Sequence, residues 1–206
     1  MVLEIGRYTG GGPAAAFITE AVDECANRNF SGIAIDTGGA KHSPSALPLS
    51  RLLATAAEQN GLQLFVPESL SAAGENAIVR ISTALSGGTL TRHMTDAVDK
   101  YGAGRVALEI ERVCMDFELP TPSGIGKALS QRELAALMSR HTAHPFFSPA
   151  LGTNYFAYRD KNARFVLFDD AVSIRHKLSL GVRLGIESAF LFYPHVTDMW
   201  DEISAL

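Results

Sequence analysis

The sequence predicts an α/β protein built as a small or incomplete (β/α) barrel of the TIM type. Strand-like apolar runs alternate with helical patterns along the chain, and this alternation is typical of a parallel sheet covered by helices. A second observation is the apolar run 32–36, which ends in Asp36 and is followed by glycines. Read as a buried strand, this run delivers a carboxylate to a loop at the end of the strand, where barrel enzymes carry their chemistry.

Each expected element has a local signal of its own. Gly61 fits the C-cap of a helix, and Ser130 and Glu133 have the spacing of a capping box that begins a helix reaching about Arg140. The other helices are expected at 14–27, 49–60, 91–101, 173–184 and 197–203, and the core strands at 2–8, 33–36, 62–66, 77–83, 105–113 and 188–193. The runs 155–159 and 164–168 predict a β-hairpin inserted before the last helix–strand unit.

A single domain spanning residues 1–206 is expected, because the chain contains no linker or low-complexity segment. Its length is small for a full barrel, and six core strands leave two sheet edges that proteins normally pair or cover. The sheet therefore closes as a smaller barrel, stays open with covered edges, or pairs its edges with another copy. We expect a homo-oligomer formed through these edges.

Composition and charge limit the binding partners and the cellular compartment that we expect for this protein. Eighteen Lys and Arg against 22 Asp and Glu leave a net charge of −4, which gives no electrostatic reason to expect nucleic acid or an anionic membrane. No signal peptide or membrane-spanning run is recognised. Cys25 and Cys114 are too few for a disulfide framework. A cytoplasmic protein without cofactor is expected, with spore or cell-envelope association left open.

His141 and His144 lack a third ligand, so no metal is predicted.

Strand alternation places several charged side chains on one face of the sheet. In the run 105–113, Glu109 and Glu111 lie opposite the apolar side chains. The same reasoning places Glu4, Asp36 and Arg80 on the inner face of their strands. Charges removed from water without partners cost on the order of several kcal/mol each. The cluster is therefore either a paired ionic core with trapped water or a site for a polar ligand.

The stretch from Ser31 to Gly38 resembles the signature strand of the family 18 glycoside hydrolases, whose pattern is Asp-Gly-x-Asp-x-Asp-x-Glu. Gly32 and Asp36 match this pattern, whereas Ser31, Ala34 and Gly38 replace the first Asp, the second Asp and the Glu.

The later chain resembles the spore-cortex-lytic branch of the same family. There a hairpin leads to an aromatic-acidic-acidic turn, here Phe168 to Asp170, and then to a helix with Ser173 and Lys177. Asp169 and Asp170 are expected to cap this helix. Phe192 stands nearest the place of the tryptophan that lies beneath the sugar in the family. Residues 80–85 depart from the family pattern, because they lack its Tyr and Asp.

The resemblance implies chemistry in which a protonated Glu donates to the glycosidic oxygen while an Asp two residues earlier holds the substrate's N-acetyl group. Asp36 fits the second role, but Gly38 cannot donate a proton, and losing a general acid costs on the order of 10²–10⁴-fold in rate. We therefore expect a catalytically impaired protein that binds a carbohydrate or small polar molecule, or is structural. The alternative is an active glycosidase on N-acetylated glycans of the chitin or peptidoglycan type, using a relocated acid. Candidate catalytic residues are Asp36, Glu68 and Glu111, and candidate ligand-binding residues are Tyr8, Asp36, Arg80, Glu109, Glu111 and Phe192.

Overall fold

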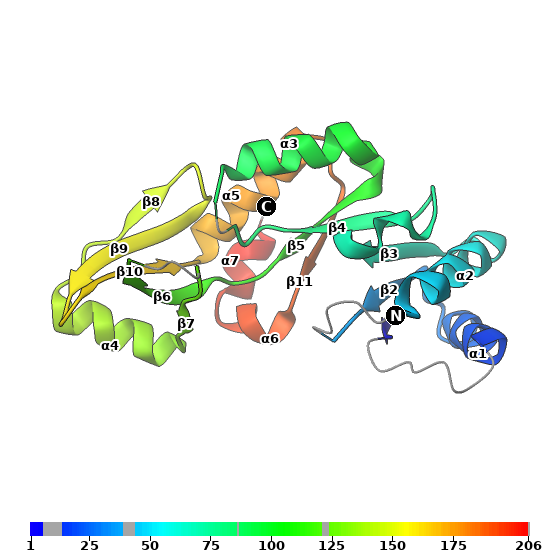
Figure 1. The fold of residues 1–206 in the computed structure, drawn as a ribbon, viewed down its shortest axis with the longest axis horizontal. Helices are drawn as coiled ribbons and strands as arrows, with labels where there is room; N and C mark the ends of the chain where they lie inside the picture. Colours follow the sequence, from blue (N-terminus) through cyan, green and yellow to red (C-terminus); the bar gives the residue numbers. More distant parts are fainter. Residues whose placement is uncertain (6–13, 39–43, 86, 121–123, 206) are drawn as a thin grey trace. The chain divides into compact units, whose positions relative to one another are not determined.

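A computed structural model describes residues 1–5, 14–38, 44–85, 87–120 and 124–205 (Figure 1). The chain divides into two compact units. Unit 1 comprises residues 1–81, 97–107 and 186–188, and unit 2 comprises residues 82–96, 108–185 and 189–206. Each unit is described by itself below. The expectation of a single domain stays a prediction, although one sheet takes strands from both units.

That six-stranded sheet gives the protein its fold class. Its strand order is β1-β2-β3-β4-β5-β11, and the pairs from β1 to β4 are parallel. The strands are β1 (Val2–Glu4), β2 (Gly32–Asp36), β3 (Gln63–Pro67), β4 (Ile78–Ser82), β5 (Val106–Ile110) and β11 (Ser188–Leu191). β1 and β11 stand at the two ends of this order. The predicted incomplete (β/α) barrel is confirmed, with an open rather than a closed sheet over the described residues.

Two helices accompany the sheet in unit 1. α1 (Ala14–Asn27) has the bounds that the sequence predicts, and α2 (Ala46–Gln59) begins about one turn earlier than expected. Gly61 follows the C-cap of α2 with φ of +64°, a conformation that glycine adopts without a Cβ penalty. The apolar faces of these helices and strands form a buried core that includes Cys25, Ile33, Ile35, Leu53, Leu64 and Val66. A short 3₁₀ helix, η1 (Glu68–Ala73), follows β3, and α3 (Leu90–Tyr101) follows β4.

Unit 2 contains a five-stranded antiparallel sheet of which the sequence predicted two strands. The expected hairpin is β9 (Thr153–Arg159) and β10 (Ala163–Phe168), paired antiparallel. The complete strand order is β7-β6-β10-β9-β8. The added strands are β6 (Cys114–Leu119), β7 (Lys127–Ala128) and β8 (Phe146–Ser148). β6 does carry a signal, because Met115, Phe117 and Leu119 alternate with acidic residues.

One face of this second sheet is covered by α4 (Gln131–His141). Ser130 accepts a hydrogen bond from the backbone of Glu133, whose side chain accepts one from the Ser130 backbone, so the predicted capping box is confirmed. Leu134 of the helix is buried against the sheet in a cluster that also contains Cys114, Leu129, Phe156, Val166 and Phe168. Burial raises the pKa of the Cys114 thiol. This face of the sheet is therefore a packed core.

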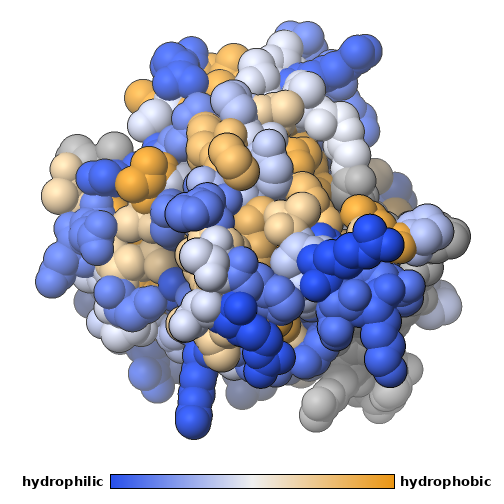
Figure 2. All heavy atoms as spheres, turned by 90° about the vertical axis from the view of Figure 1, so that its left-hand side faces the viewer, coloured by the Kyte–Doolittle hydropathy of each residue, from blue (hydrophilic) through white to orange (hydrophobic). Residues whose placement is uncertain are grey.

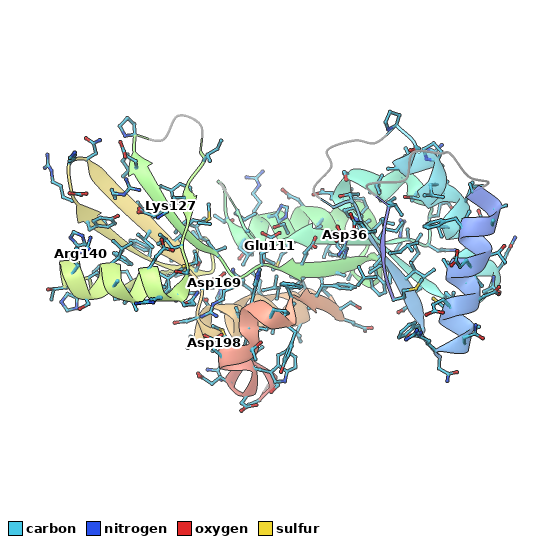
Figure 3. The ribbon with its side chains drawn as sticks, turned by 90° about the horizontal axis from the view of Figure 1, so that it is seen from below. Asp36, Glu111, Lys127, Arg140, Asp169 and Asp198 are labelled. Carbon is cyan, nitrogen blue, oxygen red and sulfur yellow. The ribbon has the colours of Figure 1, made fainter. Side chains whose placement is uncertain are left out.

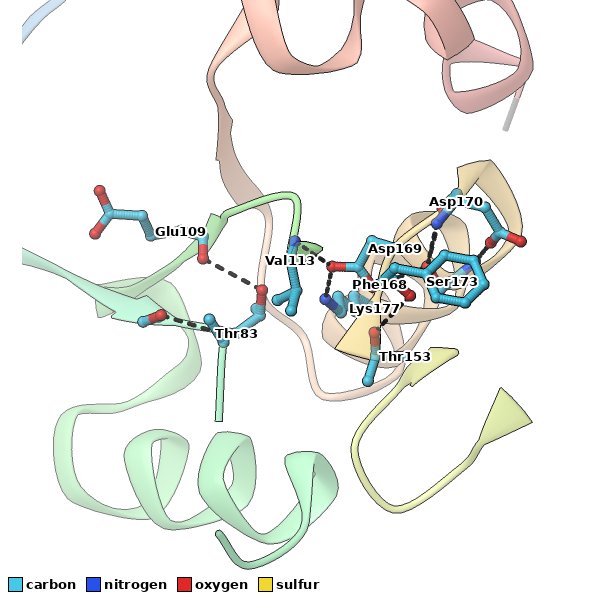
Figure 4. A network of polar contacts seen from close by, with 11 residues as sticks. Thr83, Glu109, Val113, Thr153, Phe168, Asp169, Asp170, Ser173 and Lys177 are labelled. Carbon is cyan, nitrogen blue, oxygen red and sulfur yellow. Dashed lines mark hydrogen bonds and ion pairs between the residues drawn. The ribbon is translucent and has the colours of Figure 1, made fainter. Parts of the chain in front are cut away.

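A buried polar network joins the second sheet to α5 (Ala171–Arg183) (Figure 4). Asp169 accepts hydrogen bonds from the Val113 backbone at 2.9 Å and the Ser173 hydroxyl at 2.9 Å, and pairs with Lys177 at 2.6 Å. Asp170 is the N-cap of α5, with Ser173 completing a capping box. The expected capping role is thus confirmed for Asp170 and wrong for Asp169. The difference arises because Asp169 points into the interior, where it neutralises a lysine.

The chain continues beyond β11 as short helical pieces rather than the one helix predicted for 197–203. These pieces are α6 (Tyr193–Val196), η3 (Thr197–Met199) and α7 (Trp200–Ser204). Within the described residues, no helix has the length and apolar character that crossing a membrane requires.

Candidate functional site

Asp36 stands at the carboxyl end of β2, as the strand pattern predicts. Its side chain is exposed, and its Oδ1 accepts a hydrogen bond of 2.9 Å from the backbone N–H of Gly38. This local bond is typical of aspartate in turns, where the side chain satisfies the backbone two residues later. The carboxylate of Asp36 is thereby held close to the backbone of position 38.

Glu4 occupies the space next to Gly38. Glu4 and Asp36 are register partners in the parallel pair β1–β2, so both carboxylates lie at the same edge of the sheet. Gly38 has φ of +60°, and a Cβ built there would lie 2.8 Å from Glu4 Oε1. Any side chain at position 38 therefore meets both a strained backbone conformation and the Glu4 carboxylate. The structure brings Glu4, Asp36 and Gly38 together, and we call these three residues the Glu4–Asp36 site.

Arg80 also belongs to unit 1. It is half-buried on β4 between the fully buried Val79 and Ile81, and its guanidinium donates a hydrogen bond to the Ile35 carbonyl. The cation thus lies beside the residue of β2 that precedes Asp36. Glu68 is exposed at the first position of η1. Tyr8 lies outside the described residues.

The remaining predicted site residues belong to unit 2. Glu109 is half-buried on β5, and its carbonyl accepts hydrogen bonds from the Thr83 backbone and hydroxyl at 3.0 and 3.3 Å (Figure 4). Phe192 is 61% exposed and makes an edge contact with the His195 ring. Glu111, labelled in Figure 3, follows β5. Its exposed side chain borders a cavity.

That cavity lies wholly within unit 2 and has a volume of about 1090 Å³, slightly above the usual range of small-molecule sites. Its walls come from the loop after β4, the segment after β5, the face of the second sheet opposite α4, and the start of α6. Apolar residues on these walls include Leu85, Val113, Met115, Phe117, Leu119, Leu129, Leu151, Phe165 and Leu167. The cavity is therefore mainly apolar, with a polar border at Glu111, Arg112 and Asp198.

Arg112 is the most constrained charged residue at this border. Its side chain is 10% exposed, and its Nη1 donates to Asp198 Oδ1 at 2.7 Å and to the His195 carbonyl at 2.9 Å. The hydrogen bond from Arg112 lowers the pKa of Asp198 below its usual value. The buried Nε of Arg112 has no hydrogen-bond acceptor among the described residues.

Sequence reasoning missed Arg112 and Asp198 as site residues. The two residues are separated by 86 positions, and no local pattern links residues so far apart. The available signal was three charged residues within four positions, Glu109, Glu111 and Arg112, because a cation beside two carboxylates at a strand end can take part in a site. Among the described residues, no group of three or more His, Cys, Asp or Glu could hold a metal ion.

Comparison with solved structures places the fold in the class of chitinases and spore cortex-lytic enzymes. A class V chitinase from Nicotiana tobaccum, solved as a point mutant in complex with NAG4, superposes with a TM-score of 0.67 at 11% identity, over 99% of this chain and 78% of that one. The Bacillus cereus spore cortex-lytic enzyme SleL gives a TM-score of 0.65 at 19% identity, over 97% of this chain and 54% of that one.

A chitinase from Chromobacterium violaceum gives a TM-score of 0.64 at 19% identity, over 92% of this chain and 70% of that one. No family model matches the sequence, and no curated protein matches it. The resemblance to the family 18 glycoside hydrolases is thus confirmed at the level of the fold. The chain spans only about half of SleL.

Proposed function

We propose that the protein is a catalytically impaired chitinase-like protein that binds an N-acetylated glycan at the Glu4–Asp36 site. The observation that supports this most is the environment of Gly38. A glycine with φ of +60°, whose missing Cβ would lie 2.8 Å from Glu4 Oε1, stands where the resemblance would place the acid. A side chain at position 38 would have to displace the Glu4 carboxylate.

The groups that remain are suited to binding. Asp36 presents a carboxylate that accepts hydrogen bonds, as an N-acetyl N–H or a sugar hydroxyl would require. Arg80 donates to the backbone just before Asp36, which stabilises the end of β2. Holding a sugar needs donors and acceptors in fixed positions, whereas cleaving its glycosidic bond also needs a proton at the bridging oxygen.

Titration with chitotetraose tests the proposal. We expect saturable binding that raises the midpoint of thermal unfolding as ligand concentration rises. Asp36→Ala should weaken the binding, whereas Asp23→Ala, which removes an exposed aspartate of α1, should not. The absence of saturable binding, or equal binding by both variants, would show that this site does not take the glycan.

A second candidate function is favoured by the position of Glu4. Because Glu4 Oε1 lies so near the absent Cβ of residue 38, Glu4 is the described carboxyl group best placed to be a relocated acid. In this alternative, Glu4 would protonate the glycosidic oxygen while the bond to C1 breaks and the N-acetyl oxygen attacks C1. Glu4→Gln would then abolish measurable turnover of chito-oligosaccharides, whereas Glu20→Gln, on the exposed side of α1, would leave it unchanged.

A further inference from the structure

We infer that the cavity of unit 2 is a second binding site, for a molecule with an alkyl chain and an uncharged amide head. This inference is independent of the glycan proposal, which concerns residues of unit 1. Its starting point is the contrast between the two faces of the second sheet. One face packs against α4, whereas on the other face the side chains of β6 and β10 are half-buried or exposed and line the cavity.

Cross-strand pairs build this apolar wall. Phe117 is the register partner of Phe165, and Met115 is the partner of Leu167, so the four side chains form two adjacent pairs on one face. All four line the cavity, and each is half-buried. Figure 2, viewed from the left-hand side of Figure 1, shows hydrophobic side chains reaching the surface between hydrophilic ones. Binding of an apolar ligand is favoured because it removes this half-buried apolar surface from water.

Phe117 packs closely against Gly126 on this wall. A Cβ added to Gly126 would lie 2.8 Å from Phe117 Cε1, so the ring is packed directly on the glycine backbone. The absence of a side chain at position 126 is what leaves room for the ring. This contact holds Phe117 in its position on the cavity wall, and a preformed wall lowers the entropic cost of binding.

The chemistry of the wall favours an alkyl chain over a sugar. Leucine, valine and methionine side chains offer no strong hydrogen-bond partners, and burying sugar hydroxyls against them would leave those hydroxyls unsatisfied. Methionine in particular adapts to flexible apolar ligands. The wall provides Leu85, Val113, Met115, Leu119, Leu129, Leu151 and Leu167 for such contacts.

The polar border selects the head group. Arg112 lines the cavity and is nine-tenths buried, and its Nε–H has no acceptor among the described residues. A ligand oxygen brought within reach of the Nε–H would satisfy a donor that is otherwise costly to bury. Arg112 is already neutralised by Asp198, and Glu111 adds a second carboxylate. A carboxylate head would therefore be repelled. A primary amide matches the border, because its oxygen accepts from Arg112 while its NH₂ donates to a carboxylate.

Octanamide and octanoate test this inference, because they share a chain and differ in the charge of the head. We expect calorimetric titration of the full chain to show saturable binding of octanamide and at least about tenfold weaker binding of octanoate, the discrimination expected when a like charge is buried. Arg112→Lys keeps a positive charge beside Asp198 but removes the Nε–H. It should weaken octanamide binding about three- to tenfold, the loss expected for one hydrogen bond.

Two further variants complete the test. Arg92→Lys changes an exposed arginine of α3, paired with Asp96, and should leave octanamide affinity unchanged. Met115→Trp adds volume to the wall without touching the polar border, so it should reduce octanamide binding even if Arg112→Lys fails to fold. The inference is wrong if octanamide shows no saturable binding, if octanoate binds as tightly, or if Met115→Trp binds octanamide like the wild type while retaining its near-ultraviolet circular dichroism.

Discussion

Lys177 Nζ lies 2.6 Å from Asp169 Oδ2, and neither side chain is exposed to solvent. A buried ion pair of this kind does not guarantee stability, because both charges lose their hydration. Its geometry does make each partner indispensable to the other. The Val113 backbone and the Ser173 hydroxyl also donate to Asp169, so this carboxylate links the segment after β5 to the first turn of α5.

Removing the Asp169 carboxylate should therefore strongly destabilise the protein. Asp169→Ala leaves a buried ammonium without a counter-ion, and we expect it to lower the free energy of unfolding by about 3–5 kcal/mol. The apolar double variant Asp169→Leu with Lys177→Met removes both charges. Its loss of unfolding free energy should be clearly smaller than the summed losses of Asp169→Leu alone and Lys177→Met alone. Urea unfolding measures each value. Additive losses, or a small effect of Asp169→Ala, would show that the pair does not act as a unit.

A glutamate at position 38 should destabilise the protein. Gly38→Glu introduces a side chain at φ of +60° and a Cβ 2.8 Å from Glu4 Oε1, and we expect it to destabilise the protein by about 1–3 kcal/mol. Gly61→Glu is the matched control, because its φ is +64° and nothing lies within 4 Å of its Cβ position.

The difference between the two glutamate variants measures the crowding by Glu4. Adding Glu4→Ala to Gly38→Glu should remove much of that difference. If Gly38→Glu and Gly61→Glu lower the free energy of unfolding in urea by the same amount, the Glu4 carboxylate does not crowd position 38.

The capping box of α4 should make stability depend on pH. Hydrogen bonds from the Ser130 backbone and side chain, with Lys127 nearby, lower the pKa of Glu133 to about 2. Because the folded-state pKa lies below that of the unfolded chain, the ionised form stabilises the fold above about pH 4.5, and this contribution is lost as pH falls towards 2. The stability gap between wild type and Glu133→Gln should therefore shrink over this range. Glu20→Gln, on the exposed side of α1, should show no such trend; a gap for Glu133→Gln that is constant with pH would contradict the prediction.

The open sheet order predicts association through its edges. β1 stands at one end of the sheet, and Val2 on it is 68% exposed. Sedimentation velocity should show a homo-oligomer, and Val2→Lys should shift it towards the monomer, because a lysine on an edge strand opposes pairing with another strand. Val172→Lys changes a valine of α5 that is 59% exposed and should leave the oligomer intact. A wild-type protein that stays monomeric at high concentration would contradict this prediction.

The sequence could predict the elements whose signals are local. The bounds of α1, the capping box at Ser130 and the antiparallel hairpin all follow from periodicity, cap residues and turn spacing. The second sheet was only partly foreseen, because β7 and β8 are short. Asp169 looked like a second cap, since nothing local shows that it pairs with a lysine eight residues later.

In the candidate sites, too, only the features set by residues adjacent in sequence could be predicted. The position of Asp36 at a strand end could be predicted, because a strand and a following glycine are adjacent in sequence. The approach of Glu4 to Gly38 depends on the pairing of β1 with β2, and the approach of Arg112 to Asp198 depends on how the chain returns after β11. Such contacts form only when distant segments pack together, so composition and spacing could not reveal them.

The proposal that this chitinase-like fold binds glycans without cleaving them is tested most directly by incubating the protein with chitotetraose and following the products by mass spectrometry. We predict that the tetramer remains intact at concentrations that stabilise the protein. Release of shorter oligomers, abolished by Glu4→Gln, would contradict it and would identify Glu4 as the acid.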